Sequence, residues 1–224
     1  NQGTGSQSKN KTDMFVQALT AFLDIITAEI SRKAIPDLLF LNGAYAESIV
    51  VPARLVQKNL LRLKAQTEFR DAALTEPLAC VVLGVEETRL REGQRVLILG
   101  AGPIGLMFVA LARNLGCVVA VAGRGEKRLQ AARKLGATQV FDVGATGDIV
   151  GTIPKDERFD AVIEAVGKPE AWEAATKLVR KGGIVNFFGG CPAGTTVSLD
   201  TGLLLAPRGI GVSATMIIAG KMVA

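Results

Sequence analysis

The segment GAGPIG contains three glycines with the spacing of a dinucleotide-binding turn. Gly100, Gly102 and Gly105 match the pattern G-x-G-x-x-G, and Pro103 and Ile104 stand between the last two. Gly100 permits a tight turn, Gly102 lets the backbone approach a pyrophosphate, and Gly105 lets a helix pack closely on the preceding strand. Free N–H groups at the N-terminus of that helix would bind the phosphates. The alternative is a structural glycine turn that binds no ligand.

The segment VAGRGEKR bears on the choice of dinucleotide. NAD-binding domains usually carry an acidic residue about 20 residues after the first glycine, and it binds the ribose hydroxyls. Gly123 stands at that position, where it leaves space and no negative charge, and Arg124 follows it. Arg128 lies one helical turn further on, and guanidinium groups suit phosphate. The segment therefore favours NADP(H) over NAD(H), unless Arg124 only faces solvent and is neutralised by Glu126.

Two further segments, EAVG and NFFGG, end in small residues at the ends of predicted strands. Ligands of open α/β sheets bind beyond the carboxyl ends of the strands. Small residues there let the backbone come close to the nicotinamide ring. These segments predict cofactor contacts from six residues: Ala165, Val166, Gly167, Phe188, Gly189 and Gly190.

Alternating strands and helices must position these segments. The run RVLILG is apolar and ends in glycine, as is typical of a buried parallel strand, and an amphipathic helix follows each strand. The pattern predicts an α/β fold, a Rossmann doubly wound parallel sheet with helices on both faces. The expected strands are Arg95–Leu99, Val118–Ala122, Gln139–Phe141, Ala161–Glu164 and Ile184–Phe188.

The N-terminal part of the chain has a different pattern. Residues 1–11 are polar, and polar side chains then recur every three or four residues, which predicts one amphipathic helix up to Lys33. That helix could pack on the domain, mediate dimerisation or lie on a membrane surface. Residues Leu41–Leu63 contain a β-rich stretch, and Thr75–Thr88 is predicted to be helical.

These patterns predict three parts of the chain. Residues 1–37 form a polar tail and the amphipathic helix, residues 38–75 a β-rich part, and residues 76–224 the NAD(P)-binding Rossmann domain.

The composition excludes several classes of protein. The net charge is +5 with lysine and arginine spread along the chain, which does not favour nucleic-acid binding. No run of about 18 apolar residues predicts a membrane span, and the polar start does not resemble a signal peptide. The three cysteines are far apart, which favours a reducing compartment, the cytoplasm. The chain has no histidine, so any mechanism must work without imidazole.

The motifs EPLAC, GAGPIG and NFFGG together resemble the medium-chain dehydrogenase/reductase superfamily, closest to the zinc-type alcohol, sorbitol and threonine dehydrogenases. The resemblance covers roughly residues 38–201. It implies a two-domain oxidoreductase in which zinc polarises an alcohol or carbonyl while hydride passes to or from nicotinamide. It also implies that residues 38–75 are a remnant of the β-rich catalytic domain. Of the zinc ligands that the sorbitol-like members use, only the glutamate of the EPL motif is present, as Glu76. We therefore expect this chain to bind no zinc ion.

The sequence thus predicts the NADP(H)-binding domain of an alcohol or polyol dehydrogenase-like oxidoreductase, with no identifiable catalytic residue. The alternative is a non-catalytic nucleotide-binding or assembly module that has lost the zinc site. A small alcohol or polyol would be the substrate of a complete enzyme. The apolar segment Gly209–Ile218 could form an exposed edge strand, so a homodimer is expected.

Overall fold

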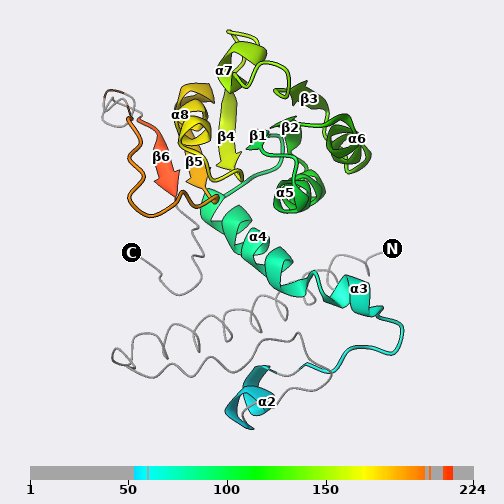
Figure 1. Cartoon of the computed structure of the whole chain (residues 1–224). Coiled ribbons are helices and arrows are strands. Elements are labelled where there is room, and N and C mark those ends of the chain that lie inside the picture. Colours follow the sequence, from blue (N-terminus) through cyan, green and yellow to red (C-terminus); the bar gives the residue numbers. More distant parts are fainter. Residues whose placement is uncertain (1–52, 60, 200–201, 203–208, 214–224) are drawn as a thin grey trace. The chain divides into compact units, whose positions relative to one another are not determined.

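The computed structural model describes residues 53–59, 61–199, 202 and 209–213. The chain divides into two compact units, one comprising Asn1–Thr75 with Ala219–Ala224 and the other Glu76–Ile218. In the described part of the first unit, helix α2 spans Ala53–Asn59 and helix α3 spans Phe69–Ala72 (Figure 1). The predicted N-terminal amphipathic helix lies outside the described residues.

The β-rich interpretation of Leu41–Leu63 is wrong for the residues of α2. Ala53–Asn59 has the sequence ARLVQKN and is helical. Alanine, arginine, leucine, glutamine and lysine all have high helix propensity, which exceeds the β preference of the single valine in this segment. The residues before Ala53 lie outside the described part of the chain.

The second unit is built on a six-stranded parallel sheet with the order β3-β2-β1-β4-β5-β6. This order is that of a doubly wound nucleotide-binding sheet, so the predicted Rossmann fold is confirmed (Figure 1). The strands are β1 Arg95–Leu99, β2 Val118–Gly123, β3 Gln139–Asp142, β4 Phe159–Glu164, β5 Val179–Phe187 and β6 Gly211–Ser213. The helices are α4 Thr75–Thr88, α5 Pro103–Asn114, α6 Glu126–Lys134, α7 Ile149–Thr152 and α8 Pro169–Leu178.

The last two strands differ most from the sequence prediction. Strand β5 begins at Val179, five residues before the predicted Ile184, because helix α8 ends at Leu178 and Val179 already pairs with Phe159. The pairing is irregular between Phe159 and Ala161 and becomes regular at Ile184. Strand β6, within the segment Gly209–Ile218 that was expected to form an edge, pairs with β5 and lies at one end of the sheet.

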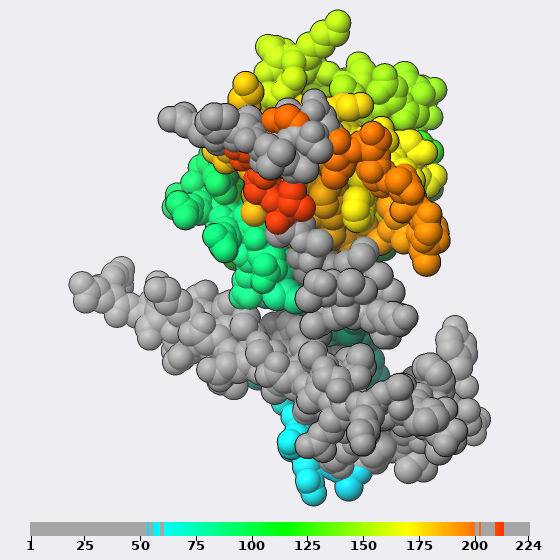
Figure 2. Space-filling model, turned by 90° about the vertical axis from the view of Figure 1, so that its left-hand side faces the viewer, coloured from blue at the N-terminus to red at the C-terminus, as the bar shows by residue number. Residues whose placement is uncertain are grey.

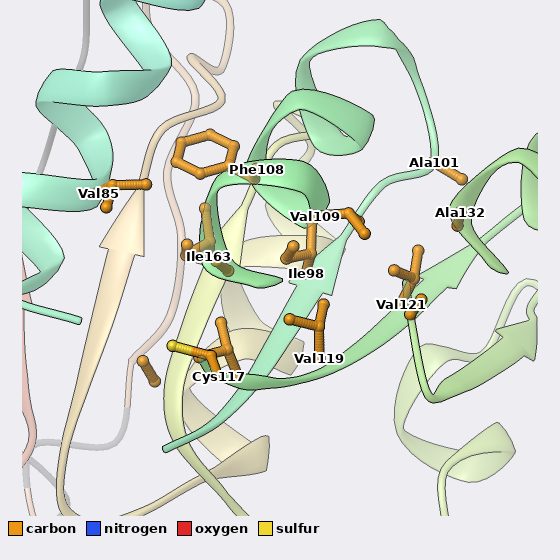
Figure 3. Close-up of a cluster of buried hydrophobic side chains, with 14 of the residues drawn as sticks. Val85, Ile98, Ala101, Phe108, Val109, Cys117, Val119, Val121, Ala132 and Ile163 are labelled. Carbon is orange, nitrogen blue, oxygen red and sulfur yellow. The ribbon is translucent and has the colours of Figure 1, made fainter. Parts of the chain in front are cut away.

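Alternate side chains of each central strand enter two separate cores, one on each face of the sheet. In β1, Val96 and Ile98 join the core under α4, α5 and α6, whereas Leu97 and Leu99 join the core under α8. Figure 3 shows the first core, in which Phe108 of α5 lies near Val85 of α4. Because both faces are covered, the central strands are apolar at nearly every position.

The turn from β1 into α5 depends on two glycines with different requirements. Gly100 has φ +112°, in the left-handed region that favours glycine. At Gly105 a Cβ atom would lie 1.9 Å from the carbonyl oxygen of Gly100, so no side chain fits there. Gly102 has extended backbone, and a Cβ atom there would meet no atom within 4 Å. The backbone conformation therefore requires glycine at position 100 and a close backbone contact requires it at position 105, whereas the fold leaves open space beside Gly102.

Charged groups connect the opposite, amino-terminal ends of β1, β4 and β5. The Asp160 carboxylate accepts the Arg95 N–H at 2.8 Å and the Arg180 Nε–H at 2.6 Å. Arg95 also pairs with Glu157. Burial raises the pKa of Asp160, but the hydrogen bonds from Arg95 and Arg180 and their positive charges outweigh it, so the pKa is lowered overall.

We expect the variants Gly105→Ala and Gly102→Ala to differ sharply in stability. Gly105→Ala places a methyl group against rigid backbone and should lower the free energy of unfolding by about 3 kcal/mol or more. Gly102→Ala adds a methyl group in open space and should lower it by no more than about 1 kcal/mol, the loss expected at a helix N-cap. Urea denaturation followed by circular dichroism measures both values, and equal losses would contradict the structure.

We expect Asp160→Asn to lower the free energy of unfolding by about 1 kcal/mol at neutral pH, because the charged partner of Arg180 is lost. A carboxylate with a lowered pKa stabilises the folded state above its unfolded-state pKa. That stabilisation disappears as the pH falls through the folded-state pKa. The gap between the variant and the wild type should therefore close in acid.

Urea denaturation at a series of pH values measures this gap. Asp156→Asn, at an exposed carboxylate in the loop before β4, serves as the control. A gap for Asp160→Asn that is the same at every pH would show that Asp160 acts by packing alone.

Candidate functional site

The described residues of the second unit form a cavity of about 570 Å³ beyond the carboxyl ends of β1, β2 and β4. Its wall begins at Leu99, where β1 ends, and includes the turn into α5, the end of β2 and the loop after β4. Strands β1 and β4 are neighbours in the sheet, although β2 and β3 lie between them in the chain. This is the point at which the strand order reverses, where doubly wound sheets bind ligands.

The structure brings together half of the residues that the sequence predicted for the cofactor site. They come from three separate segments, and all of them line the same cavity. These residues are Gly100, Gly102, Gly123, Arg124, Arg128, Ala165 and Val166.

The other predicted residues lie close to the cavity without lining it. Pro103, Ile104 and Gly105 form the first turn of α5. Gly167 and Gly189 bring the two loops after β4 and β5 into contact, since a Cβ atom at Gly189 would lie 2.4 Å from the Gly167 nitrogen. At Gly167 a Cβ atom would lie 2.6 Å from the carbonyl oxygen of a third predicted residue, Gly190.

Phe188 has a packing role instead of a place in the cavity. Its ring meets Phe108 edge to face, with 4.9 Å between the centroids, and it packs against the core that Figure 3 shows. The sequence predicted a cofactor contact because Phe188 follows the last residue of a strand. The structure turns its side chain into the core on the α5 side of the sheet.

Several residues of the cavity were missed in the sequence. Lys168 and Glu170 lie at the start of α8, directly after β4, and the rule that ligands lie beyond strand ends could have found them. Val143 and Ile149 line the wall beside the end of β3, and no sequence signal distinguishes them from ordinary core residues.

The charged groups of the cavity favour an anionic ligand. Three cationic side chains, Arg124, Arg128 and Lys168, line it together with one carboxylate, Glu170. The carboxylate that was considered as a neutralising partner of Arg124 is occupied elsewhere, because Glu126 pairs with Arg133 at 3.5 Å. No salt bridge joins Arg124 to any carboxylate in the described ranges.

The expectation that Gly123 leaves space is wrong. A Cβ atom at Gly123 would lie 2.5 Å from the Cβ of Ala101 and 3.0 Å from its nitrogen. The methyl group of Ala101, within the GAGPIG turn, fills the volume that an acidic side chain would need. An aspartate at position 123 therefore requires a change at position 101 as well.

A buried carboxylate lies beneath the cavity wall. Glu164, the last residue of β4, is 0% exposed, and its Oε1 accepts the N–H groups of Val166 at 2.6 Å and Gly167 at 2.9 Å. Burial raises the pKa of Glu164, although these two backbone hydrogen bonds act in the opposite direction. Glu164 is the first residue of the segment EAVG, but it was not predicted as a site residue because it has the position of the last residue of a buried strand.

The described residues do not fit a zinc ion. The one position that matches a family ligand, Glu76, accepts a hydrogen bond from the Cys80 thiol at 3.4 Å. Burial and the charge of Glu76 raise the pKa of Cys80 to about 11. In the described part of the chain, no three side chains of His, Cys, Asp or Glu could hold a metal together.

The same cavity does fit a dinucleotide phosphate. The N-terminus of α5 begins at the cavity wall, no side chain at Gly102 blocks the backbone, and the adjacent cations would offset phosphate charge.

None of the helices that the structure describes is long and apolar enough to cross a membrane.

Comparisons with known proteins agree with this geometry. A family model described as zinc-binding dehydrogenase matches residues 103–220, more than half of the chain. Sorbitol dehydrogenase of Bacillus subtilis (strain 168) is 31% identical over 156 residues, which cover 66% of this chain and 43% of that protein. L-threonine 3-dehydrogenase of Paraburkholderia phytofirmans is 32% identical over 159 residues, 70% of this chain and 45% of that protein.

A solved structure supports the same relationship. The zinc-binding dehydrogenase of Sinorhizobium meliloti 1021, bound to NADP, is 34% identical and superposes with a TM-score of 0.58. The match covers 62% of this chain and 42% of that one, so the chain spans less than half the length of the relatives it matches. With its Rossmann sheet, its glycine turn and these relatives, the chain belongs to the zinc-binding dehydrogenase family of the medium-chain dehydrogenase/reductase superfamily.

Proposed function

We propose that this chain supplies the NADP(H)-binding domain of an oxidoreductase that transfers hydride between nicotinamide and an alcohol or carbonyl. One observation carries the proposal: the glycine turn opens into a cavity whose β2 side has two arginines and no acidic residue at position 123. The relative from Sinorhizobium meliloti that was solved with NADP supports the same class of ligand.

Each segment of the cavity would have its own part in binding. The turn Gly100–Gly105 and the N-terminus of α5 would hold the pyrophosphate. Arg124, assisted by Arg128, would donate hydrogen bonds to the 2′-phosphate of the adenosine half. The loop Ala165–Gly167 would lie against the nicotinamide half, which supplies the hydride chemistry when the cofactor is bound.

The guanidinium group of Arg124 lies along a loop that is compatible with this role. A Cβ atom at Gly147 would lie 3.9 Å from Arg124 Nη2, so the guanidinium group lies beside the loop after β3. No carboxylate of the described residues forms a salt bridge with it there. Asp142 is engaged within that loop, where its Oδ1 accepts the Gly144 N–H at 2.8 Å. The donors of Arg124 are thus available to an anion in the cavity.

The second candidate is a non-catalytic nucleotide-binding or assembly module. It is supported by the observation that no three described side chains of His, Cys, Asp or Glu are placed to hold a metal together. A nucleotide-binding module would use the same cavity and would differ from the first candidate in taking part in no hydride transfer, whereas an assembly module would need no cofactor.

We also propose a cytoplasmic homodimer and the division into residues 1–37, 38–75 and 76–224. Strand β6 supports the dimer, because it is the last strand of the sheet and Val212 is 50% exposed there. Figure 2 shows β6 at the surface. An uncovered edge strand has unpaired backbone groups that a second copy could pair with.

We expect titration calorimetry to show tighter binding of NADP(H) than of NAD(H). A charge-assisted hydrogen bond to phosphate contributes on the order of 1.5–3 kcal/mol, which corresponds to roughly 10- to 150-fold in affinity. Arg124→Ala should erase most of this difference. Lys134→Ala, at an exposed cation in the last turn of α6 that does not line the cavity, should leave it unchanged.

Two glycine-turn variants extend this test. Gly102→Ala should weaken both cofactors, because its methyl group would stand where the pyrophosphate approaches the backbone. The double variant Ala101→Gly/Gly123→Asp should invert the preference, since it supplies both the carboxylate and the volume that it needs. Equal affinities of the wild type for the two cofactors would end the assignment to NADP(H).

We expect the 224-residue chain to bind NADP(H) without oxidising alcohols, even with zinc added. The reason is that no group of described residues could hold the metal that polarises the substrate in this family. The measurement follows the absorbance of reduced nicotinamide with NADP⁺ and a panel of alcohols and polyols, beside an active alcohol dehydrogenase. Turnover that disappears in Arg124→Ala would show instead that the chain is a working enzyme.

A further inference from the structure

A fully buried carboxylate stands at the end of β4, directly after three buried apolar residues. Glu164 is 0% exposed and follows Ala161, Val162 and Ile163, which are equally buried. An apolar residue would fill this position without the free energy that is needed to remove a carboxylate from water. A buried charged group therefore calls for a contact that an apolar side chain could not make.

The contacts of Glu164 are made with the loop that follows its own strand. Its Oε1 accepts two backbone N–H groups, from Val166 at 2.6 Å and from Gly167 at 2.9 Å. Its Oε2 is buried and has no hydrogen-bond partner among the described residues. One carboxylate oxygen thus fixes two consecutive peptide groups.

The loop that Glu164 holds is a wall of the cavity. Ala165 and Val166 line it, and the Val166 side chain is 44% exposed. Gly167 continues into direct backbone contact with the loop after β5, since a Cβ atom at Gly189 would lie 2.4 Å from the Gly167 nitrogen and 2.6 Å from Glu164 Oε2. A shift of the carboxylate would therefore move both loops.

A second group fixes the loop after β5 from the other side. Trp172 of α8 donates its Nε1–H to the carbonyl oxygen of Gly189 at 3.0 Å. Its ring stacks on Phe187, with 4.2 Å between the centroids. The backbone carbonyl oxygen of Glu164 also accepts the N–H groups of Phe188 at 3.0 Å and Gly189 at 2.8 Å, so Glu164 holds the loop after β5 through its backbone and the loop after β4 through its carboxylate.

We propose that Glu164 is a positioning residue for the nicotinamide half of the bound dinucleotide, acting through the N–H groups of Val166 and Gly167. It does not touch the cofactor, because no atom of its side chain reaches the cavity surface. The inference rests on the proposed NADP(H) function. It adds that the adenosine end of the site, around Arg124, is independent of Glu164.

The test compares two ligands that share the adenosine end. NADPH occupies the whole site, whereas adenosine 2′,5′-bisphosphate lacks the nicotinamide half. The variant Glu164→Ala should raise the dissociation constant of NADPH at least about tenfold, because both hydrogen bonds to the loop are lost, and should leave that of the bisphosphate within about twofold. Titration calorimetry on the full chain measures both constants.

Two further variants separate positioning from general stability. Glu164→Gln keeps a carbonyl oxygen that can accept both N–H groups, so its affinity for NADPH should lie within about threefold of the wild type. Glu87→Ala, at an exposed glutamate of α4, should bind both ligands like the wild type. A role in folding alone would weaken the two ligands equally and would overturn the inference.

Amide hydrogen exchange on the wild-type chain provides a measurement that needs no variant. The N–H groups of Val166 and Gly167 should exchange slowly although they lie outside any helix or strand, and rapid exchange of both would overturn the inference. If the wild type binds the bisphosphate but Glu164→Ala binds NADPH normally, only the role of Glu164 fails. If the wild type binds neither ligand, the proposed function itself fails.

Discussion

The close approach of helix α5 to strand β1 is the contact on which the site depends. At Gly105 the helix lies so near the carbonyl oxygen of Gly100 that even a methyl group would be 1.9 Å from it. This contact brings the N-terminus of α5 directly to the end of β1, next to the neighbouring strands β2 and β4. The cavity, its charges and the order of the loops around it follow from that one backbone-to-backbone packing.

The strands and the glycine turn were predictable because both leave strong local signals. Buried parallel strands give continuous apolar runs, and β1 and α4 have the bounds that the sequence predicted. Local patterns did not reveal contacts between distant segments. The methyl group of Ala101 beside Gly123 and the places of Val143 and Ile149 on the cavity wall depend on tertiary packing, as does the early start of β5 opposite Phe159.

The cavity has different electrostatics at its two ends. On the β2 side, Arg124 and Arg128 are exposed side chains whose positive charge suits a phosphate. On the β4 side, Lys168 and Glu170 line the cavity beside the backbone of Ala165 and Val166, and the Glu164 carboxylate stays buried behind the wall. The β2 side therefore carries only cationic side chains, whereas the β4 side combines both signs of charge with a wall of backbone groups.

The stacking of the indole ring on Phe187 and its hydrogen bond to Gly189 have a practical consequence. Trp172 is the single tryptophan of the chain, and it lies in the structural element that borders the β4 side of the cavity. Its fluorescence therefore reports on one known place in the fold. Motion of the loop after β5 could be followed by the intrinsic emission of the native protein over time, without any attached label.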